Sequence, residues 1–321
     1  MKPKVYVTRH LPEAARSELA EVCDVEIWDE EFPPPYELIM KQIKDKEGLI
    51  CLLTDKIDAN LMDHAPNLKV ISQVAVGYDN IDIDAAAERA IVVGNTPEVL
   101  TDATADFAFA LLLAAARRIG EAVDYVRAGK WKTWGLTLLL GQEVHGATLG
   151  IIGMGRIGQA MAKRASGFDM KILYHSASRQ RDVEQALGVE YREFDDLLQE
   201  ADFVSLHVNL TAETHGLINA RALELMKPSA ILINTARGSI VDSDALYWAL
   251  KNGQIAAAAL DVTDPEPLPA DDKLLDLPNI IVAPHIASAT TTSRTLMAQM
   301  AVRNCTAGVQ GMPLPFPVNT V

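Results

Sequence analysis

The feature that most constrains this chain is a glycine-rich segment with the spacing G-x-G-x-x-G, formed by Gly153, Gly155 and Gly158. A short apolar run at residues 149–152 precedes it, as expected of a buried parallel strand. Gly153 permits a sharp turn, Gly155 lets the backbone approach a pyrophosphate, and Gly158 lets a helix pack on the strand. The segment therefore predicts the turn between a strand and a helix of a dinucleotide-binding unit.

The context of this turn matters, because glycine-rich turns without a ligand are common. An amphipathic helix pattern follows the glycines, and a second strand pattern at residues 171–174 closes a unit of the expected length. The helix would begin at Arg156 and Ile157, with its free N–H groups and positive dipole end directed at the phosphates. We expect a dinucleotide cofactor here.

Strand and helix patterns alternate along the rest of the chain, which predicts parallel sheets covered by helices on both faces. Strands are expected at residues 4–8, 25–28, 48–53, 68–74, 91–94, 203–207, 230–234, 256–261 and 280–283. Helices are expected at residues 13–22, 36–45, 82–89, 101–119 and 291–309. We expect an α/β chain with two doubly wound domains. We expect a Rossmann-type dinucleotide domain (residues 101–286) inserted into a flavodoxin-like substrate domain (residues 1–100 plus 287–321).

Composition excludes several classes of partner. The formal net charge of −14 argues against nucleic acid and against an anionic membrane surface, since both need clustered Lys and Arg. Cys23, Cys51 and Cys305 lie far apart, so neither a disulfide framework nor a metal site is indicated, and a reducing compartment is expected. The N-terminus has no signal-peptide pattern and the longest apolar run, residues 107–116, is too short to cross a bilayer. We expect a cytoplasmic protein.

A surface for contact with another subunit is indicated between residues 129 and 146, where the helical pattern is interrupted. Trp131, Trp134 and the leucine-rich residues 136–140 have the look of an apolar arm that packs on another subunit. This pattern predicts a homodimer.

The type of nucleotide should be decided at the end of the second strand, where an acid usually holds an NAD ribose. No carboxylate lies between Lys171 and Arg181, and Ser176, Ser178 and Arg179 could donate to a 2′-phosphate. The residues favour NADP(H), with NAD(H) as the alternative; a merely solvated charged loop is the simpler interpretation.

Three chemically capable side chains follow other strands of the same expected sheet. They are Arg237, Glu266 and His285. Taken singly, each has a plain structural interpretation: a surface ion pair, a loop acid beside prolines, and a turn histidine. Because parallel strands end at one edge, the three should converge on the crevice of the glycine turn. Together they suit hydride chemistry on a 2-keto acid.

Five further motifs follow one another along the chain: GMGRIG (153–158), LTAETHGLI (210–218), INTARGSIVD (233–242), LDVTDPEPLP (260–269) and PHIASAT (284–290). Together they resemble the D-isomer-specific 2-hydroxyacid dehydrogenase family over essentially the whole chain. Two further segments, VGYDNID (76–82) and NTPEVLTDATAD (95–106), are most similar to the glyoxylate/hydroxypyruvate and 2-ketogluconate reductases of that family.

The resemblance implies roles for individual residues. Arg237 would grip the substrate carboxylate, and His285 would protonate the developing alkoxide as general acid. Glu266 would orient the imidazole of His285 and favour its protonated form. Val76 and Gly77 would complete the carboxylate site with their backbone amides. It also implies substrate contact for Ser288, and cofactor contacts for Thr101, Thr214, Thr235 and Asp261.

The expected activity is reduction of small 2-keto acids, glyoxylate and hydroxypyruvate first. The departure from NADP-using relatives is Ala177, which stands where many of them have arginine. Two alternatives remain: a 2-ketogluconate reductase, and a non-catalytic NAD(H)-sensing binding protein similar to transcriptional co-repressors with the same fold. The latter carry extended tails, whereas this chain begins in a strand and ends shortly after its last helix, which favours an enzyme.

Overall fold

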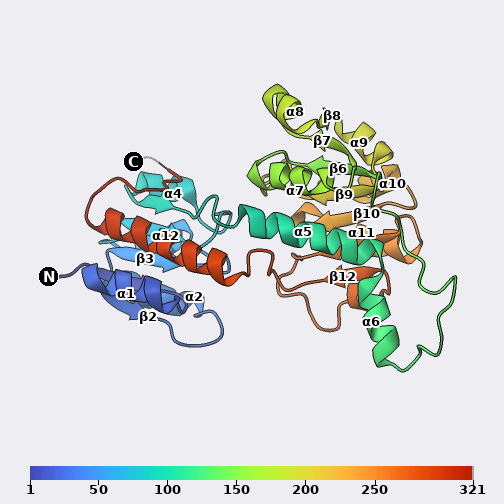
Figure 1. The fold of residues 1–321 in the computed structure, drawn as a ribbon. Helices are drawn as coiled ribbons and strands as arrows, with labels where there is room; N and C mark the ends of the chain where they lie inside the picture. Colours follow the sequence, from blue (N-terminus) through green and yellow to red (C-terminus); the bar gives the residue numbers. More distant parts are fainter. Residues whose placement is uncertain (320–321) are drawn as a thin grey trace. The chain divides into compact units, whose positions relative to one another are not determined.

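The computed structural model describes residues 1–319, which form two compact units. The first unit contains Met1–Leu100 and the segment from Ala289 onward, and the second contains Thr101–Ser288. Each unit is built on one parallel sheet with helices on both faces (Figure 1). The expected fold class, two doubly wound parallel sheets, is confirmed.

The sheet of the first unit has the strand order β2-β1-β3-β4-β5, with every neighbouring pair parallel. This is the order of flavodoxin-like folds. Its strands are β1 (Lys4–Val7), β2 (Asp24–Ile27), β3 (Gly48–Cys51), β4 (Val70–Gln73) and β5 (Val92–Gly94). All five lie within one or two residues of the strands that hydrophobic patterning predicts.

Alternate residues of these strands face two separate cores. Val5 and Val7 of β1 pack with α1 (Glu13–Val22) and α12 (Thr291–Val309), whereas Tyr6 faces the opposite core. That opposite core is covered by α2 (Tyr36–Gln42), η1 (Ile43–Asp45), α3 (Ala59–Asp63) and α4 (Ile83–Glu88). The hydroxyl of Ser72 donates to the Ala301 carbonyl at 2.8 Å, which ties the C-terminal helix to β4.

The sheet of the second unit has the order β12-β11-β10-β9-β6-β7-β8, again all parallel. Its strands are β6 (Thr148–Ile152), β7 (Lys171–His175), β8 (Glu190–Tyr191), β9 (Phe203–Leu206), β10 (Ile231–Asn234), β11 (Ala257–Leu260) and β12 (Ile280–Val282). Six of the seven strands have the Rossmann order, and β12 extends it. The chain leaves β6 in both directions, so the point between β6 and β9 is where open α/β sheets bind ligands.

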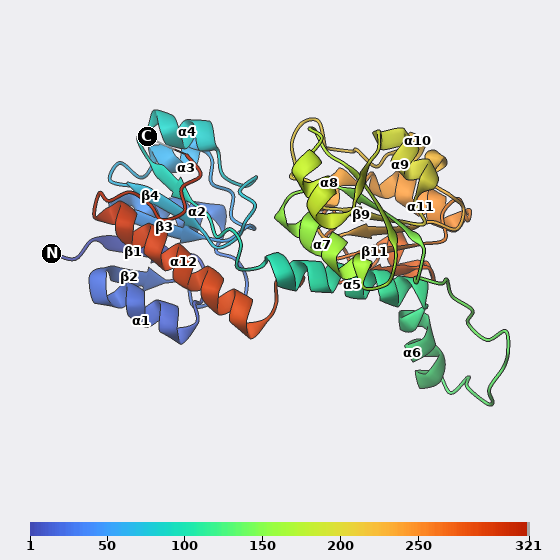
Figure 2. The same cartoon turned by 45° about the horizontal axis from the view of Figure 1, so that its top comes forward.

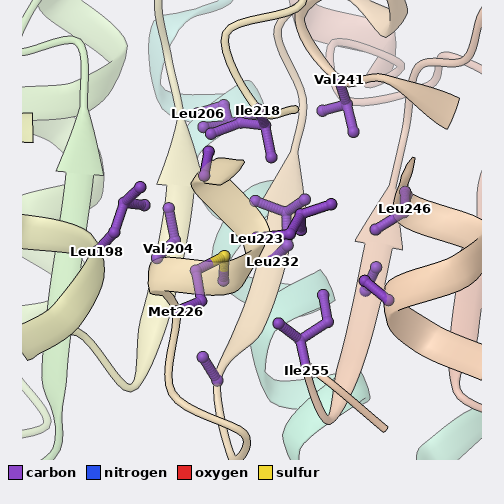
Figure 3. Close-up of a cluster of buried hydrophobic side chains, with 14 of the residues drawn as sticks. Leu198, Val204, Leu206, Ile218, Leu223, Met226, Leu232, Val241, Leu246 and Ile255 are labelled. Atoms are coloured by element: carbon purple, nitrogen blue, oxygen red, sulfur yellow. The ribbon is translucent and has the colours of Figure 1, made fainter. Parts of the chain in front are cut away.

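Helices cover both faces of this sheet (Figure 2). One face carries α5 (Thr101–Ala116), α7 (Arg156–Ser166) and α8 (Arg181–Leu187). The other carries α9 (Phe194–Glu200), α10 (Ala220–Leu225) and α11 (Ser243–Lys251), together with η2 (Gly238–Ile240) and η3 (Lys273–Asp276). Figure 3 shows the core on the second face, where Leu223 and Leu232 pack among aliphatic side chains. The central strands β9 and β10 are buried along their whole length.

The long apolar helix expected at residues 101–119 ends earlier than predicted. α5 stops at Ala116, and Arg118 adopts a left-handed conformation with φ of +53°. A new helix, α6 (Ile119–Arg127), then begins, and none of its residues is buried. α6 and the irregular segment that follows it project from the second unit (Figure 1).

The three cysteines are buried and form no disulfide. Burial raises the pKa of Cys23 to about 11 and lifts the pKa values of Cys51 and Cys305 well above the ordinary range. The thiols therefore stay protonated and pack as small apolar groups. Across residues 1–319, no helix is long and apolar enough to span a bilayer, and no cluster of three His, Cys, Asp or Glu side chains could bind a metal.

Candidate active site

The glycine turn follows β6, and its three glycines are not equivalent. Gly153 has φ of +99°, and a Cβ there would lie 2.5 Å from the His207 backbone. A Cβ on Gly158 would lie 2.1 Å from the Gly153 carbonyl oxygen. A Cβ on Gly155 would meet no atom within 4 Å. Packing inside the protein thus requires Gly153 and Gly158, whereas Gly155 faces open space.

This open space suits a dinucleotide. Gly155 is the N-cap of α7, and Arg156 and Ile157 form its first turn, so backbone N–H groups of a helix start point into it. At the end of β10, the hydroxyl of Thr235 is buried and has no hydrogen-bond partner among the described residues. A buried hydroxyl of this kind is costly unless a ligand completes it. Both observations fit a cofactor along this edge of the sheet.

The side chains of His285 and Glu266 form a close pair. Nδ1 of His285 lies 2.5 Å from Oε1 of Glu266, and 22% of the histidine side chain and 32% of the glutamate side chain are exposed. Oε2 of Glu266 also accepts from the Thr263 amide at 3.4 Å. A carboxylate on Nδ1 fixes the ring orientation and the tautomer, and it leaves Nε2 on the opposite side of the ring. The geometry is that of a histidine prepared for proton transfer.

The loop that carries His285 is hydrogen-bonded to Asp261, which is 1% exposed and follows β11. Its two carboxylate oxygens accept from the amides of Ile286 and Ala287 at 2.8 and 2.7 Å. Its backbone carbonyl accepts from the His285 amide at 2.8 Å. Burial raises the pKa of Asp261. These bonds stabilise His285 in a left-handed conformation (φ +55°), which is strained for a non-glycine residue.

Arg237 lies in the loop after β10, and a buried asparagine shapes that loop. Nδ2 of Asn234 donates to the Arg237 carbonyl at 2.8 Å, and Oδ1 of Asn234 accepts from the Ala236 amide at 2.9 Å. A Cβ on the next residue, Gly238, would lie 2.0 Å from the Thr263 carbonyl group. The Arg237 loop therefore packs directly on the loop that leads to Glu266. The structure brings Arg237, Glu266 and His285 to one edge of the seven-stranded sheet.

The second unit contains other residues that the sequence predicts as cofactor or substrate contacts. The Ser176 hydroxyl donates to the Ser178 carbonyl at 2.7 Å, and Arg179 is paired with Glu184. The hydroxyl of Thr214 closes its own turn, because it donates to the Asn209 carbonyl at 2.6 Å. Thr101 is the first residue of α5, and Ser288 is the last residue of the second unit.

Val76 and Gly77 belong to the first unit, in the loop after β4. Nδ2 of Asn95 donates to the Val76 carbonyl at 2.8 Å, and Nε2 of Gln73 donates to the Gly77 carbonyl at 3.3 Å. Gln73 is fully buried, and it also donates to Oδ1 of Asn80 at 2.8 Å. These two hydrogen bonds fix the orientation of the Val76 and Gly77 carbonyl groups. Sequence reasoning missed the two amide side chains, although a buried Gln at the end of an apolar strand was an available signal.

A further residue that sequence reasoning missed is His207, at the carboxyl end of β9. The Ser205 hydroxyl lies 2.8 Å from its Nε2. Burial lowers the pKa of His207 to about 4. The imidazole is therefore neutral at ordinary pH and lies beside the glycine turn, where Gly153 contacts its backbone.

Neutral His207 should make the fold acid-sensitive. In the unfolded chain its pKa returns to about 6.5, so between about pH 4 and pH 6.5 the unfolded state binds more protons. Its contribution to stability is fully present above pH 6.5 and is lost as pH falls toward 4. When the pH is lowered from about 7 to about 4.5, the free energy of unfolding in urea should fall for the wild type by about 1 to 3 kcal/mol more than for His207→Gln. Equal losses would contradict this, and the exposed His64→Gln is the control.

The Rossmann strand order, the open glycine turn and the His285–Glu266 pair define a dinucleotide-dependent oxidoreductase. Residues 109–287 match the family described as D-isomer specific 2-hydroxyacid dehydrogenase, NAD binding domain. A glyoxylate reductase of Korarchaeum cryptofilum is 53% identical over 320 residues, which cover 99% of this chain and 96% of the relative. The chain belongs to the D-isomer specific 2-hydroxyacid dehydrogenase family.

Two solved structures are similar over nearly the full length. A protein from Thermus thermophilus has a TM-score of 0.93 and 48% identity, covering 98% of this chain and 100% of that chain. An NADPH-dependent glyoxylate/hydroxypyruvate reductase from Sinorhizobium meliloti, in complex with NADP and malonate, has a TM-score of 0.88 and 34% identity. That match covers 99% of this chain and 97% of the other.

Proposed function

We propose that this protein reduces glyoxylate and hydroxypyruvate to the corresponding 2-hydroxy acids with NAD(P)H. The observation that carries the proposal is the 2.5 Å contact between His285 and Glu266, at the same sheet edge as the glycine turn. The similarity to a glyoxylate reductase and to a glyoxylate/hydroxypyruvate reductase supports these two substrates.

The side chains divide the work of a carbonyl reduction. The nicotinamide, when bound, supplies the hydride for the carbonyl carbon. Nε2 of His285 gives a proton to the carbonyl oxygen, and Glu266 stabilises the charged imidazole and orients it. The guanidinium of Arg237 suits bidentate pairing with the substrate carboxylate.

Residues 1–100 plus 287–321 are proposed as the substrate domain, and residues 101–286 as the dinucleotide domain. In the first unit the carbonyls of Val76 and Gly77 are held by Asn95 and Gln73. The amides of this loop then have a fixed direction and can bind a carboxylate. Ser288 is a further proposed substrate contact. The proposed cofactor contacts are those predicted from sequence: Thr101, Gly153, Gly155, Arg156, Ile157, Gly158, Ser176, Ser178, Arg179, Thr214, Thr235 and Asp261. Asp261 also positions the His285 loop.

The substrate range distinguishes the candidate activities. Initial rates with glyoxylate, hydroxypyruvate and 2-ketogluconate, each with NADPH and NADH, should give the highest kcat/KM for one of the first two acids. A preference for the sugar acid by tenfold or more, about 1.4 kcal/mol, would identify a 2-ketogluconate reductase instead. No oxidation of either cofactor with any acid would favour an NAD(H)-sensing binding protein.

We propose NADPH as the favoured cofactor, with NADH accepted. The segment between Lys171 and Arg181 has no carboxylate, and Ser178 and Arg179 are exposed in the loop after β7. The Sinorhizobium meliloti reductase was crystallised with NADP. Ala177 in place of an arginine argues for a moderate rather than a strict preference.

We propose a homodimer formed through the arm of residues 129–146. Trp134 and Leu136 are 77% and 78% exposed, and Trp131 and Leu140 exceed 60%, which is unusual for a water-facing segment. Sedimentation at micromolar concentration should show a dimer, and Leu136→Asp should shift it to monomer. Leu275→Asp, at an exposed leucine outside the arm, should remain dimeric. A wild-type monomer would refute the proposal.

A cytoplasmic location is also proposed, because three buried free thiols suit a reducing compartment. Cell fractionation should place the protein in the cytosolic fraction.

A further inference from the structure

The loop after β7 is contacted by a carboxylate that lies outside the segment from Lys171 to Arg181. Arg179 forms a bidentate ion pair with Glu184 of α8. Nε lies 2.8 Å from Oε1, and Nη2 lies 2.9 Å from Oε2. The arginine side chain is 55% exposed and that of the glutamate 16%. Two of the three guanidinium nitrogens are therefore directed toward α8.

Two tyrosines hold this pair in place. The Tyr174 hydroxyl donates to Oε1 of Glu184 at 2.8 Å and accepts from the Gln180 amide at 2.7 Å. The guanidinium carbon of Arg179 lies 5.7 Å from the centre of the Tyr191 ring. The hydrogen bond from Arg179 is the main cause that lowers the pKa of Glu184 to about 2, and the hydrogen bond from Tyr174 acts in the same direction. The glutamate is thus ionised at any working pH.

The pair lies at the position that reads the ribose of the cofactor. β7 is the strand next to β6, in a register that pairs His175 with Ile152 just before the glycine turn. The loop from Ser176 to Gln180 therefore leaves the sheet beside that turn, and α8 follows it (Figure 1). In Rossmann folds this loop meets the 2′ position of the adenosine ribose.

We propose that Glu184 is a specificity-determining residue for the cofactor, acting through Arg179. The Glu184 carboxylate fixes the Arg179 guanidinium and places a negative charge directly behind it. A 2′-phosphate that approaches Arg179 is attracted by the guanidinium and repelled by the carboxylate, and this repulsion acts through the partly solvated loop. A 2′-hydroxyl carries no charge, so its binding does not depend on the sum of these two charges. Glu184 thereby reduces the preference for NADPH that Arg179 provides. The inference rests on the proposed placement of the cofactor.

The variant Glu184→Gln tests this, because the amide keeps the shape and can still accept one bond from Arg179, but carries no charge. Binding of 2′,5′-ADP, which presents the 2′-phosphate alone, should become about tenfold tighter, or about 1.4 kcal/mol. Binding of 5′-AMP should change by less than about twofold, and this also shows that the site is folded. The kcat/KM ratio of NADPH to NADH should rise by a similar factor.

The matched control is Asp182→Asn, which removes the same charge from an exposed position of the same helix outside the pair. It should leave both ligands within about twofold of wild type. Unchanged or weaker 2′,5′-ADP binding in Glu184→Gln would overturn the inference, as would an equal effect in the control. If the wild type prefers NADH, the proposed NADPH preference fails, yet the shift caused by Glu184→Gln is still measured.

Discussion

Replacing His285 with alanine is expected to lower kcat for glyoxylate by a factor on the order of 10² or more. The imidazole is the group that the site prepares for proton transfer, with Nδ1 held by Glu266 and the loop amides held by Asp261. Without it, the alkoxide must take its proton from water. The Kd for NADPH should remain near the wild-type value, because His285 is not part of the glycine turn. Steady-state rates and a fluorescence titration of NADPH separate these two effects.

Glu266→Gln tests whether the two residues act as one unit. The amide can still contact Nδ1 but cannot balance the charge of an imidazolium, so kcat should fall about tenfold. The double variant should be no slower than His285→Ala, since the glutamate acts through the histidine. Additive losses would show that Glu266 works independently. His145→Ala, at an exposed histidine, is the control, and unchanged turnover in His285→Ala would remove that residue from the mechanism.

Most of the fold follows from local patterns that a sequence displays directly. The helices at residues 13–22 and 291–309 and the buried strands coincide closely with the expected ranges, because apolar periodicity and turn residues determine such elements. Alternation of strands and helices then leaves few sheet topologies. The break after Ala116 was not predictable in this way. The left-handed conformation falls on Arg118 and not on the nearby Gly120, where a sequence pattern would place it.

The site divides along a similar line. Arg237, Glu266 and His285 follow strands, so the parallel sheet brings their loops to one edge, as expected. The residues that hold these loops act through contacts across the fold, and Asn234 and Gln73 are examples. Glu184 lies only three residues beyond the segment searched for an acid, but α8 turns it back onto Arg179. Such contacts depend on tertiary geometry that spacing alone does not reveal.

The second large effect is expected at Gly155, where alanine should impair cofactor binding without harming the fold. Its backbone (φ −74°, ψ −167°) is accessible to any residue, and a Cβ there would meet no atom within 4 Å. The free energy of unfolding should stay within about 1 kcal/mol of wild type. The Cβ would occupy the space that the pyrophosphate needs, so Kd for both NADPH and NADH should rise by on the order of tenfold or more.

Gly158→Ala provides the contrast, since its Cβ would lie 2.1 Å from the Gly153 carbonyl oxygen and helix α7 would have to move off the strand. That variant should lose about 3 kcal/mol of stability or more, measured by urea unfolding in the absence of cofactor. Adding cofactor should not restore it to wild-type stability. The two alanines thus separate a glycine that the protein needs from a glycine that the ligand needs. Normal cofactor binding by Gly155→Ala would mean that the pyrophosphate lies elsewhere than over the start of α7.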